Sequence, residues 1–125
     1  MAIGAKLALP DKPVVCITGD GSAMWSIQSL WVASRYNIPV TFIVLANAAY
    51  RQVRLMKCKI LGEKAKGRNL GTELFPPQND FCKLAEGMGL RAQKVTQPED
   101  LNPALEKAFK MNQANLVEIA VDPAF

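Results

Sequence analysis

Two side chains that offer oxygen ligands, Asp20 and Asn47, each follow a short apolar run of the kind that forms a buried strand. Positions 20 and 47 are 27 residues apart, about the length of one loop, one crossover helix and one parallel strand. Oxygen-only ligands suit a hard cation such as Mg²⁺. The glycine-rich turn around Asp20, which opens a predicted helix, suits a phosphate group. The pattern therefore predicts a site for a magnesium diphosphate.

The turn Gly19-Asp20-Gly21 would supply the phosphate side of this site. Glycine has no Cβ, so the backbone of Gly19 and Gly21 can approach an anion closely. Free amides at the start of the predicted helix would bind diphosphate oxygens: those of Ser22, Ala23 and Met24. A Gly-Asp-Gly sequence alone is most often only a turn, and an isolated asparagine can simply cap a helix. The two together, at this spacing, favour a binding site.

Hydrophobic patterning predicts the elements that position these residues. Four apolar runs without alternation indicate strands buried on both faces, as in a parallel sheet: residues 14–18, 40–46, 90–95 and 116–121. Helical patterns lie before and between them: residues 2–8, 23–36 and 50–59, a short helix capped by Asn79 or Asp80, and a helix around residues 101–108. This alternation predicts an α/β fold, a layered α/β/α domain with a mainly parallel sheet. Ligands of such sheets bind at the carboxyl ends of the strands.

Some details of these elements are specific enough to be checked. The helix over 23–36 should bury a stripe of Met24, Ile27, Gln28 and Trp31, broadened by Leu30, Ala33 and Ser34. Residues 60–78 contain three glycines and two prolines, which predicts a long loop. The last helix starts either at Pro103, capped by Asn102, or near Pro98, with Pro103 inside its first turn.

Composition excludes several classes of protein. A chain of 125 residues, half of them hydrophobic, is one globular domain. It has no apolar run long enough for a membrane and no secretory signal, so we expect a cytoplasmic protein. Three cysteines without a CxxC motif should be reduced thiols, and the lack of histidine excludes histidine-based zinc sites and catalytic pairs. Residues 51–68 hold seven cations against one glutamate but no interleaved aromatics, which favours a solvated lid or loop over a nucleic-acid surface.

The stretch from Gly19 to Asn47 resembles the thiamine-diphosphate motif, which reads Gly-Asp-Gly, a spacer in the mid-twenties, then Asn-Asn. Nearly all of the chain is similar to the C-terminal cofactor-binding domain of benzoylformate-decarboxylase-like and acetolactate-synthase-like enzymes. The resemblance implies thiamine diphosphate and Mg²⁺ as cofactors, with the metal held by Asp20, Asn47 and the carbonyl of Ala49. The implied cofactor contacts are Gly19, Asp20, Gly21, Ser22, Ala23, Asn47, Ala49 and Tyr50. Two positions depart from the motif, because Ala46 replaces the first asparagine and Ala48 stands where glycine is common.

The resemblance also implies what this chain lacks. In the family, the glutamate that activates the cofactor lies on an N-terminal domain, usually of a neighbouring subunit, and the apolar residue that bends the cofactor lies upstream of the first strand. We therefore expect residues 1–125 to be a single C-terminal domain, a fragment without its first strand and without the pyrimidine-binding domain. The isolated chain should contain no catalytic residue and show no turnover. Tyr50 and Val53 would face a small 2-oxo acid, and Val53 disfavours the decarboxylases that carry a catalytic glutamate there.

Three hypotheses remain open at this point. The chain is a domain of a thiamine-diphosphate-dependent decarboxylase or carboligase, the small subunit of a heteromeric enzyme of that class, or a non-catalytic phosphate-binding α/β module. For the first two, we expect a partner domain or subunit and an oligomer, with neither nucleic acid nor membrane as a partner. Trp25, Trp31 and Met24 are candidates for the apolar surface that a partner would cover.

Overall fold

The computed structural model describes residues 1–65, 67 and 71–122. Two of the seven basic residues in 51–68, Lys66 and Arg68, lie outside this described part. The four predicted strands are present, each with bounds within one residue of the expected ones. The helices and strands are α1 (Ala2–Ala8), β1 (Val15–Gly19), α2 (Asp20–Ala23), α3 (Ser29–Arg35), β2 (Thr41–Ala46), α4 (Arg51–Leu61), η1 (Gly62–Ala65), α5 (Phe81–Gly87), β3 (Arg91–Val95), η2 (Pro98–Asp100), α6 (Leu101–Lys110) and β4 (Asn115–Ala120).

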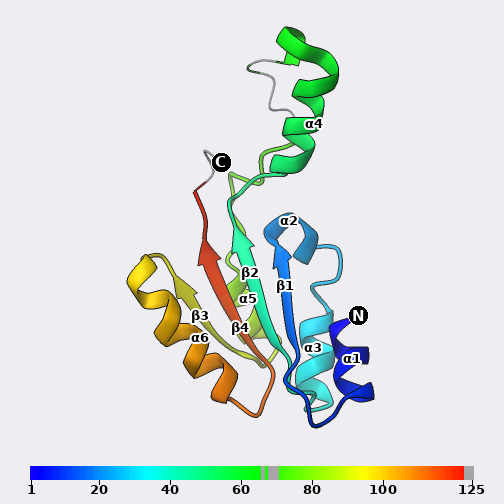
Figure 1. Cartoon of the computed structure of the whole chain (residues 1–125), viewed down its shortest axis with the longest axis vertical. Helices are drawn as coiled ribbons and strands as arrows, with labels where there is room; N and C mark the ends of the chain where they lie inside the picture. The colour runs from blue at the N-terminus through cyan, green and yellow to red at the C-terminus, as the bar shows by residue number, and fades with distance from the viewer. Residues whose placement is uncertain (66, 68–70, 123–125) are drawn as a thin grey trace.

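The four strands form one sheet in the order β1-β2-β4-β3, and every neighbouring pair is parallel. One face carries the larger core cluster, where α1, α3 and α5 pack on the sheet through residues such as Leu30 and Phe81. The other face carries α6, whose Ala104 and Ala108 pack on Val95 and Val117 of β3 and β4. Figure 1 shows α6 on the opposite side of the sheet from α3. The predicted α/β/α architecture with a parallel sheet is confirmed.

The core explains why β2 and β4 are the central strands. Val44 and Leu116 are almost fully buried, as are most residues of β2 and β4. The edge strands β1 and β3, also predicted to be buried on both faces, are instead mostly half-buried or exposed, because each has a neighbouring strand on one side only. Phe81, at the start of α5, is 1% exposed and fills the space between that helix and the sheet. Complete burial of a side chain of this size stabilises the fold by roughly 1.5–3 kcal/mol.

The helix predicted over residues 23–36 is wrong as a single element. It is divided into the four-residue α2 and the seven-residue α3, with a turn region at residues 24–28 between them. There the bonds run from residue i to i−3, as from Trp25 N to Ser22 O at 3.2 Å. Of the predicted stripe, Met24 and Trp31 are 39% and 52% exposed, whereas Leu30 and Ala33 are buried. The apolar residues do recur at helical spacing, but two of the largest of these side chains, Met24 and Trp31, are exposed to solvent.

The segment that follows β2 stands away from the sheet. α4 confirms the helix predicted over 50–59, and Figure 1 shows it rising beyond the carboxyl ends of the strands. It buries none of its residues, all of which are described. In the predicted loop over 60–78, the structure has the short helix η1 and an antiparallel bridge between Ala49 and Glu73. This bridge connects Glu73, near the end of the predicted loop, to Ala49, which closely follows β2.

Two predicted helix starts are settled by the structure. Asp80 caps α5, because its Oδ1 accepts a hydrogen bond from Lys83 N at 2.9 Å. The last helix follows the second alternative, since η2 begins at Pro98 and runs into α6, with Pro103 inside the first turn. Among the described residues, no helix is both long enough and apolar enough to cross a membrane.

Candidate functional site

The ends of β1 and β2 bring the predicted site together. Their register pairs Gly19 with Leu45, so the residues that follow the two strands leave the sheet side by side. An open cavity of about 400 Å³ lies there. Its walls come from the β1–α2 turn, the β2–α4 loop, the first turn of α4 and the end of β4: Gly19, Asp20, Gly21, Ser22, Leu45, Asn47, Ala49, Tyr50, Arg51, Gln52, Val53 and Val121.

The carboxylate of Asp20 is held by backbone groups of both loops. Its Oδ1 accepts a hydrogen bond from Gly21 N at 2.8 Å, and its Oδ2 accepts one from Ala48 N at 2.6 Å. Asp20 is only 6% exposed, so these bonds compensate for the burial of a charged group. Each carboxylate oxygen has a second lone pair, which leaves it able to bind a cation as well. Asp20 thus joins the two loops and fixes the direction of its own oxygens.

Asn47 and Ala49 form the facing side of the cavity. Asn47 Oδ1 accepts a hydrogen bond from Ala49 N at 3.1 Å, which fixes the amide orientation. The bridge to residues 72–74 uses Tyr50 N, which donates to Thr72 O at 2.8 Å, and Ala48 O, which accepts from Leu74 N at 2.8 Å. The carbonyl of Ala49 takes no part in these two bonds. The three oxygen donors predicted from the sequence therefore belong to residues that line one cavity.

The phosphate side differs in part from the prediction. The amides of Ser22 and Ala23 lie in the first turn of α2, where helix geometry provides no intrahelical acceptor. The amide of Met24, predicted to be free, instead donates to Asp20 O at 3.3 Å. The side chain of Ala23 belongs to the core, so only its backbone can serve the site. Because α2 has four residues, the long helix dipole expected over 23–36 is absent, and local N–H groups remain.

The two residues predicted to face substrate also line the cavity, in different ways. The ring of Tyr50 packs on Gly21 so closely that a Cβ built there would collide with it. Val53 lies one turn into α4 and is more than half exposed. The resemblance also implied that Arg51 and Gln52, between these two residues, face the substrate, and both line the cavity. Leu45 and Val121 were not predicted to line it, although their positions at strand ends could have indicated their place.

Ala48, one of the two departures from the motif, adopts a left-handed backbone conformation with φ of 55°. Such a conformation costs an L-residue with a Cβ roughly 1–2 kcal/mol, and glycine adopts it freely. The hydrogen bonds of its N–H to Asp20 and of its carbonyl to Leu74 N hold it there. The turn therefore keeps the shape that a glycine would give it, at the expense of local strain.

Ala48→Gly should stabilise the protein by about 0.5–1 kcal/mol, because relief of the left-handed strain exceeds the added entropy of the unfolded chain. Urea unfolding of the two proteins measures the difference. Ala49→Gly is the matched control, because Ala49 has no positive φ, and it should lower stability. A loss of stability in Ala48→Gly equal to that of the control would contradict the strained turn.

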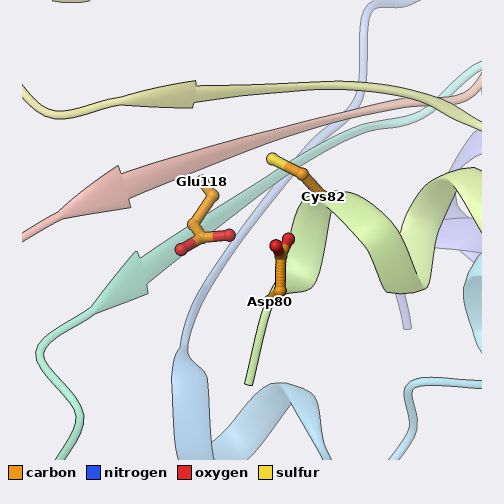
Figure 2. A group of neighbouring side chains, drawn as sticks. All are labelled: Asp80, Cys82 and Glu118. Atoms are coloured by element: carbon orange, nitrogen blue, oxygen red, sulfur yellow. The ribbon is translucent and has the colours of Figure 1, made fainter. Parts of the chain in front are cut away.

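A second group of titratable side chains lies between the start of α5 and strand β4. Figure 2 shows Asp80, which caps α5, and Cys82 of α5 converging on Glu118 of β4, and their ligand atoms lie within 4.8 Å of one another. Both oxygens of the fully buried Glu118 already have partners, since Oε1 accepts from Lys94 Nζ at 2.6 Å and Oε2 from Phe81 N at 3.0 Å. Burial raises the pKa of the Cys82 thiol to about 11, which keeps it protonated and a poor metal ligand. This group ties α5, β3 and β4 together.

The cavity at the strand ends fits a magnesium diphosphate better. A carboxylate, an amide oxygen and a carbonyl are the donors that Mg²⁺ prefers, and Mg²⁺ normally takes its remaining ligands from phosphate and water. The turn at Gly19 and Gly21 presents bare backbone beside the amides of Ser22 and Ala23. The donor set and the cradle beside it therefore suit the cofactor that the sequence predicted.

Comparisons with known proteins identify the family of the domain. Residues 1–119 match the family model described as thiamine pyrophosphate enzyme, C-terminal TPP binding domain. The chain is 37% identical over 98% of its length to a probable acetolactate synthase large subunit from Methanococcus aeolicus, of which it covers 20%. It is 36% identical over 94% of its length to benzoylformate decarboxylase from Pseudomonas aeruginosa, of which it covers 21%.

A solved structure gives the same result. The thiamine diphosphate-dependent 4-hydroxybenzoylformate decarboxylase of Rhodococcus jostii RHA1 matches 97% of this chain with a TM-score of 0.87 and 38% sequence identity, over 22% of its own length. The chain thus spans about a fifth of the length of the relatives that it matches. On the match over residues 1–119, the chain belongs to the family of C-terminal TPP-binding domains of thiamine pyrophosphate enzymes.

Proposed function

We propose that this chain binds the magnesium-diphosphate half of thiamine diphosphate, as part of a 2-oxo acid decarboxylase or carboligase of the acetolactate synthase or benzoylformate decarboxylase type. The observation that carries the proposal is the convergence of Asp20, Asn47 and Ala49 on one cavity, with Asp20 bonded to both loops. Relatives with these two activities support the reaction class. When bound, the cofactor supplies an electron sink for chemistry at the carbonyl carbon of a 2-oxo acid.

In this proposal the backbone holds the ligands ready before the metal arrives. Asp20 is oriented by Gly21 N and Ala48 N, and Asn47 is oriented by Ala49 N. Their ordering is therefore part of folding and need not be supplied by binding. Asp20 contributes the negative charge, Asn47 and the carbonyl of Ala49 contribute neutral oxygens, and the amides of Ser22 and Ala23 bind the diphosphate. Gly19 and Gly21 let the diphosphate approach the backbone.

The substrate would approach from the side of α4. Tyr50 and Val53 line that part of the cavity, and a small 2-oxo acid fits beside them better than a large one, because the cavity must also hold part of the cofactor. Among the described lining residues, only Asp20 and Arg51 carry charge. Asp20 is committed to the metal, so the lining offers no separate carboxylate as a general acid or base. We therefore propose that another domain or subunit activates the cofactor and that the isolated chain is inactive.

The difference between the two edge strands of the sheet, β1 and β3, supports the proposal that a partner pairs with one of them. β3 has Arg91 and Lys94, charges of the kind that discourage unwanted strand pairing, whereas β1 reads Val-Cys-Ile-Thr-Gly without any charge. Ile17 of β1 is 66% exposed. A strand that enters β1 through a right-handed crossover, with α1 on the face it occupies here, would lie along this open edge. We propose that a first strand from the rest of the enzyme pairs there.

Other exposed apolar surfaces would be covered by the same partner. Met24, Trp25 and Trp31 are 39%, 82% and 52% exposed, and α4 presents Val53, Met56 and Ile60 along one side at helical spacing. Lone apolar residues are normal on surfaces, but those of α4 share one side of a helix whose Val53 lines the cofactor cavity. We assign this surface to contact with a pyrimidine-binding domain or subunit in an oligomeric enzyme.

Calorimetric titration with thiamine diphosphate, in Mg²⁺ and in a chelator, tests the proposal. Binding should be measurable with Mg²⁺ and lost in the chelator, because the diphosphate and the protein each supply only part of the metal's ligands. An assay with pyruvate or benzoylformate should show no turnover by the isolated chain. Absence of binding in Mg²⁺ would favour a non-catalytic module, and turnover would show that the site is complete without a partner.

A further inference from the structure

Gly21 and Tyr50, which both line the cavity, are packed closely against each other. A Cβ placed on Gly21 would lie 2.8 Å from both Cδ1 and Cζ of the tyrosine ring, and closer still to Cε1. Ordinary van der Waals contact begins near 3.4 Å, so the ring occupies the space that any side chain at position 21 would need. The φ angle of Gly21 lies outside the left-handed region, so its backbone does not require glycine. In this structure the ring of Tyr50 leaves no room for a side chain at position 21.

Tyr50 also joins three segments of the chain. Its ring packs on the β1–α2 turn, its N–H donates to the carbonyl of the buried Thr72 at 2.8 Å, and its carbonyl accepts from Arg54 N at 3.0 Å in the first turn of α4. It follows Asn47 by three residues and touches the residue next to Asp20. The ring therefore lies between the loops that carry the two proposed metal ligands.

We propose that Tyr50 is a positioning residue, whose ring is a spacer that sets the separation of the Asp20 turn from the Asn47 loop. This inference rests on the proposed function. The 2.6 Å hydrogen bond from Ala48 N to Asp20 Oδ2 draws the loops together, and the ring, two residues further along, limits how closely they approach. Mg²⁺ binds its ligands at about 2.0–2.1 Å in near-octahedral geometry, so it tolerates little error in that separation. The ring acts by its shape, and its hydroxyl is not needed.

The test is a double-mutant cycle on Gly21→Ala and Tyr50→Ala, with thiamine diphosphate affinity measured at saturating Mg²⁺. Each single change should weaken binding by about 10- to 100-fold, the usual cost of losing a group that orients metal ligands. The double variant should regain most of the loss caused by Gly21→Ala, because the new methyl group enters the space that the ring has left. Tyr50→Phe should bind like the parent protein, since it keeps the ring.

A second readout needs no cofactor. The amide proton of Ala48 lies in the short bond to Asp20, so its NMR chemical shift reports the separation of the two loops in the free protein. The shift should move in Gly21→Ala and in Tyr50→Ala, and should stay in place in Tyr50→Phe. Gly87→Ala and Tyr36→Ala are matched controls, because a Cβ on Gly87 meets nothing within 4 Å and Tyr36 is exposed, and neither residue lines the cavity.

The outcomes separate this inference from the proposed function. If the parent chain does not bind the cofactor in Mg²⁺, the proposed function fails, and the Ala48 shift alone still decides whether the ring is a spacer. If Tyr50→Phe loses as much affinity as Tyr50→Ala, the hydroxyl makes a direct contact and the spacer is wrong. If Gly21→Ala keeps both the parent affinity and the parent Ala48 shift, the collision does not matter and the inference is overturned.

Discussion

In Asp20→Ala, Mg²⁺ should no longer increase the affinity for thiamine diphosphate, so the factor by which each ligand strengthens binding of the other should fall to about one. In the parent protein each ligand should strengthen the other by the same factor, which between linked sites is typically on the order of 5- to 150-fold. Asp20 provides the only carboxylate among the described residues that line the cavity. Without it, the protein offers Mg²⁺ only two neutral oxygens, which are too weak as ligands to displace its bound water. Cofactor titrations in Mg²⁺ and in chelator, for both proteins, measure the coupling.

Two further variants keep this result from being explained by misfolding. Asp20→Ala removes the acceptor of the buried N–H of Gly21, which costs about 1–3 kcal/mol when left unpaired, and of the partly buried N–H of Ala48. Asp20→Asn keeps one acceptor oxygen and the side-chain shape but loses the charge, so it should fold better and still lack most of the coupling. Asn47→Ala should weaken the coupling less than Asp20→Ala, because a neutral ligand is lost.

Asp11→Ala is the control, since Asp11 is exposed on the turn at the opposite end of β1 and should leave the coupling unchanged. If Asp20→Ala is folded, judged by urea unfolding, and binds the cofactor in Mg²⁺ like the parent protein, the metal site is not at Asp20. The proposed function would then have lost the observation that carries it.

The convergence of the two proposed metal ligands on one cavity could be predicted, because it depends only on sheet topology. A helix between two apolar strands makes those strands neighbours, or nearly so, and the register of β1 and β2 pairs Gly19 with Leu45. Any residue directly after each strand must then face the same space. Predicting where Asp20 and Asn47 lie therefore required no knowledge of side-chain packing, and the structure brings both to one cavity.

The break between α2 and α3 could not be predicted, because apolar periodicity does not say which apolar face is buried inside this chain. Met24 and Trp31 have helical spacing, but they face solvent in the structure and belong to the surface that we assign to a partner. The apolar residues of this stretch are of two kinds: some are buried in the core of this chain, and others belong to the proposed interface with a partner. The same difficulty applies to α4, whose apolar stripe of Val53, Met56 and Ile60 contains no buried residue.

Contacts between segments far apart in the sequence were also beyond prediction. The fit of Tyr50 on Gly21 depends on ring placement, which no spacing rule gives. Glu118 is a different case, because a single glutamate inside the apolar run 116–121 was a visible signal of a buried charge with a partner. Its partners, Lys94 and Phe81 N, lie on β3 and α5 and could be named only once the sheet order was known.

Glu118→Ala should lower the free energy of unfolding by about 1–3 kcal/mol, the usual cost of leaving a buried hydrogen-bond donor unpaired, because the side chain of Lys94 is 44% exposed and its charge can return to water. Its side chain has no exposed surface, so the change leaves a cavity and deprives the buried amide of Phe81 of its acceptor. Glu118→Gln keeps that acceptor and should cost less. Urea unfolding measures all three proteins, with Glu106→Ala as the control, because Glu106 pairs with Lys110 at 3.6 Å on the surface and should contribute less than about 1 kcal/mol.

The alkaline pH dependence tests the same pair from the other side. The hydrogen bond from Lys94 to Glu118 raises the pKa of Lys94, so the pair stabilises the folded protein fully below the unfolded pKa of lysine, about 10.4. That contribution is lost as the pH rises through the higher folded value. The stability difference between the parent protein and Lys94→Met should therefore be constant from pH 7 to 9 and shrink above about pH 10.4. A difference that stays constant across that alkaline range, or a Glu118→Ala variant as stable as the parent, would mean that the pair does not hold α5 to the sheet beneath the cofactor cavity.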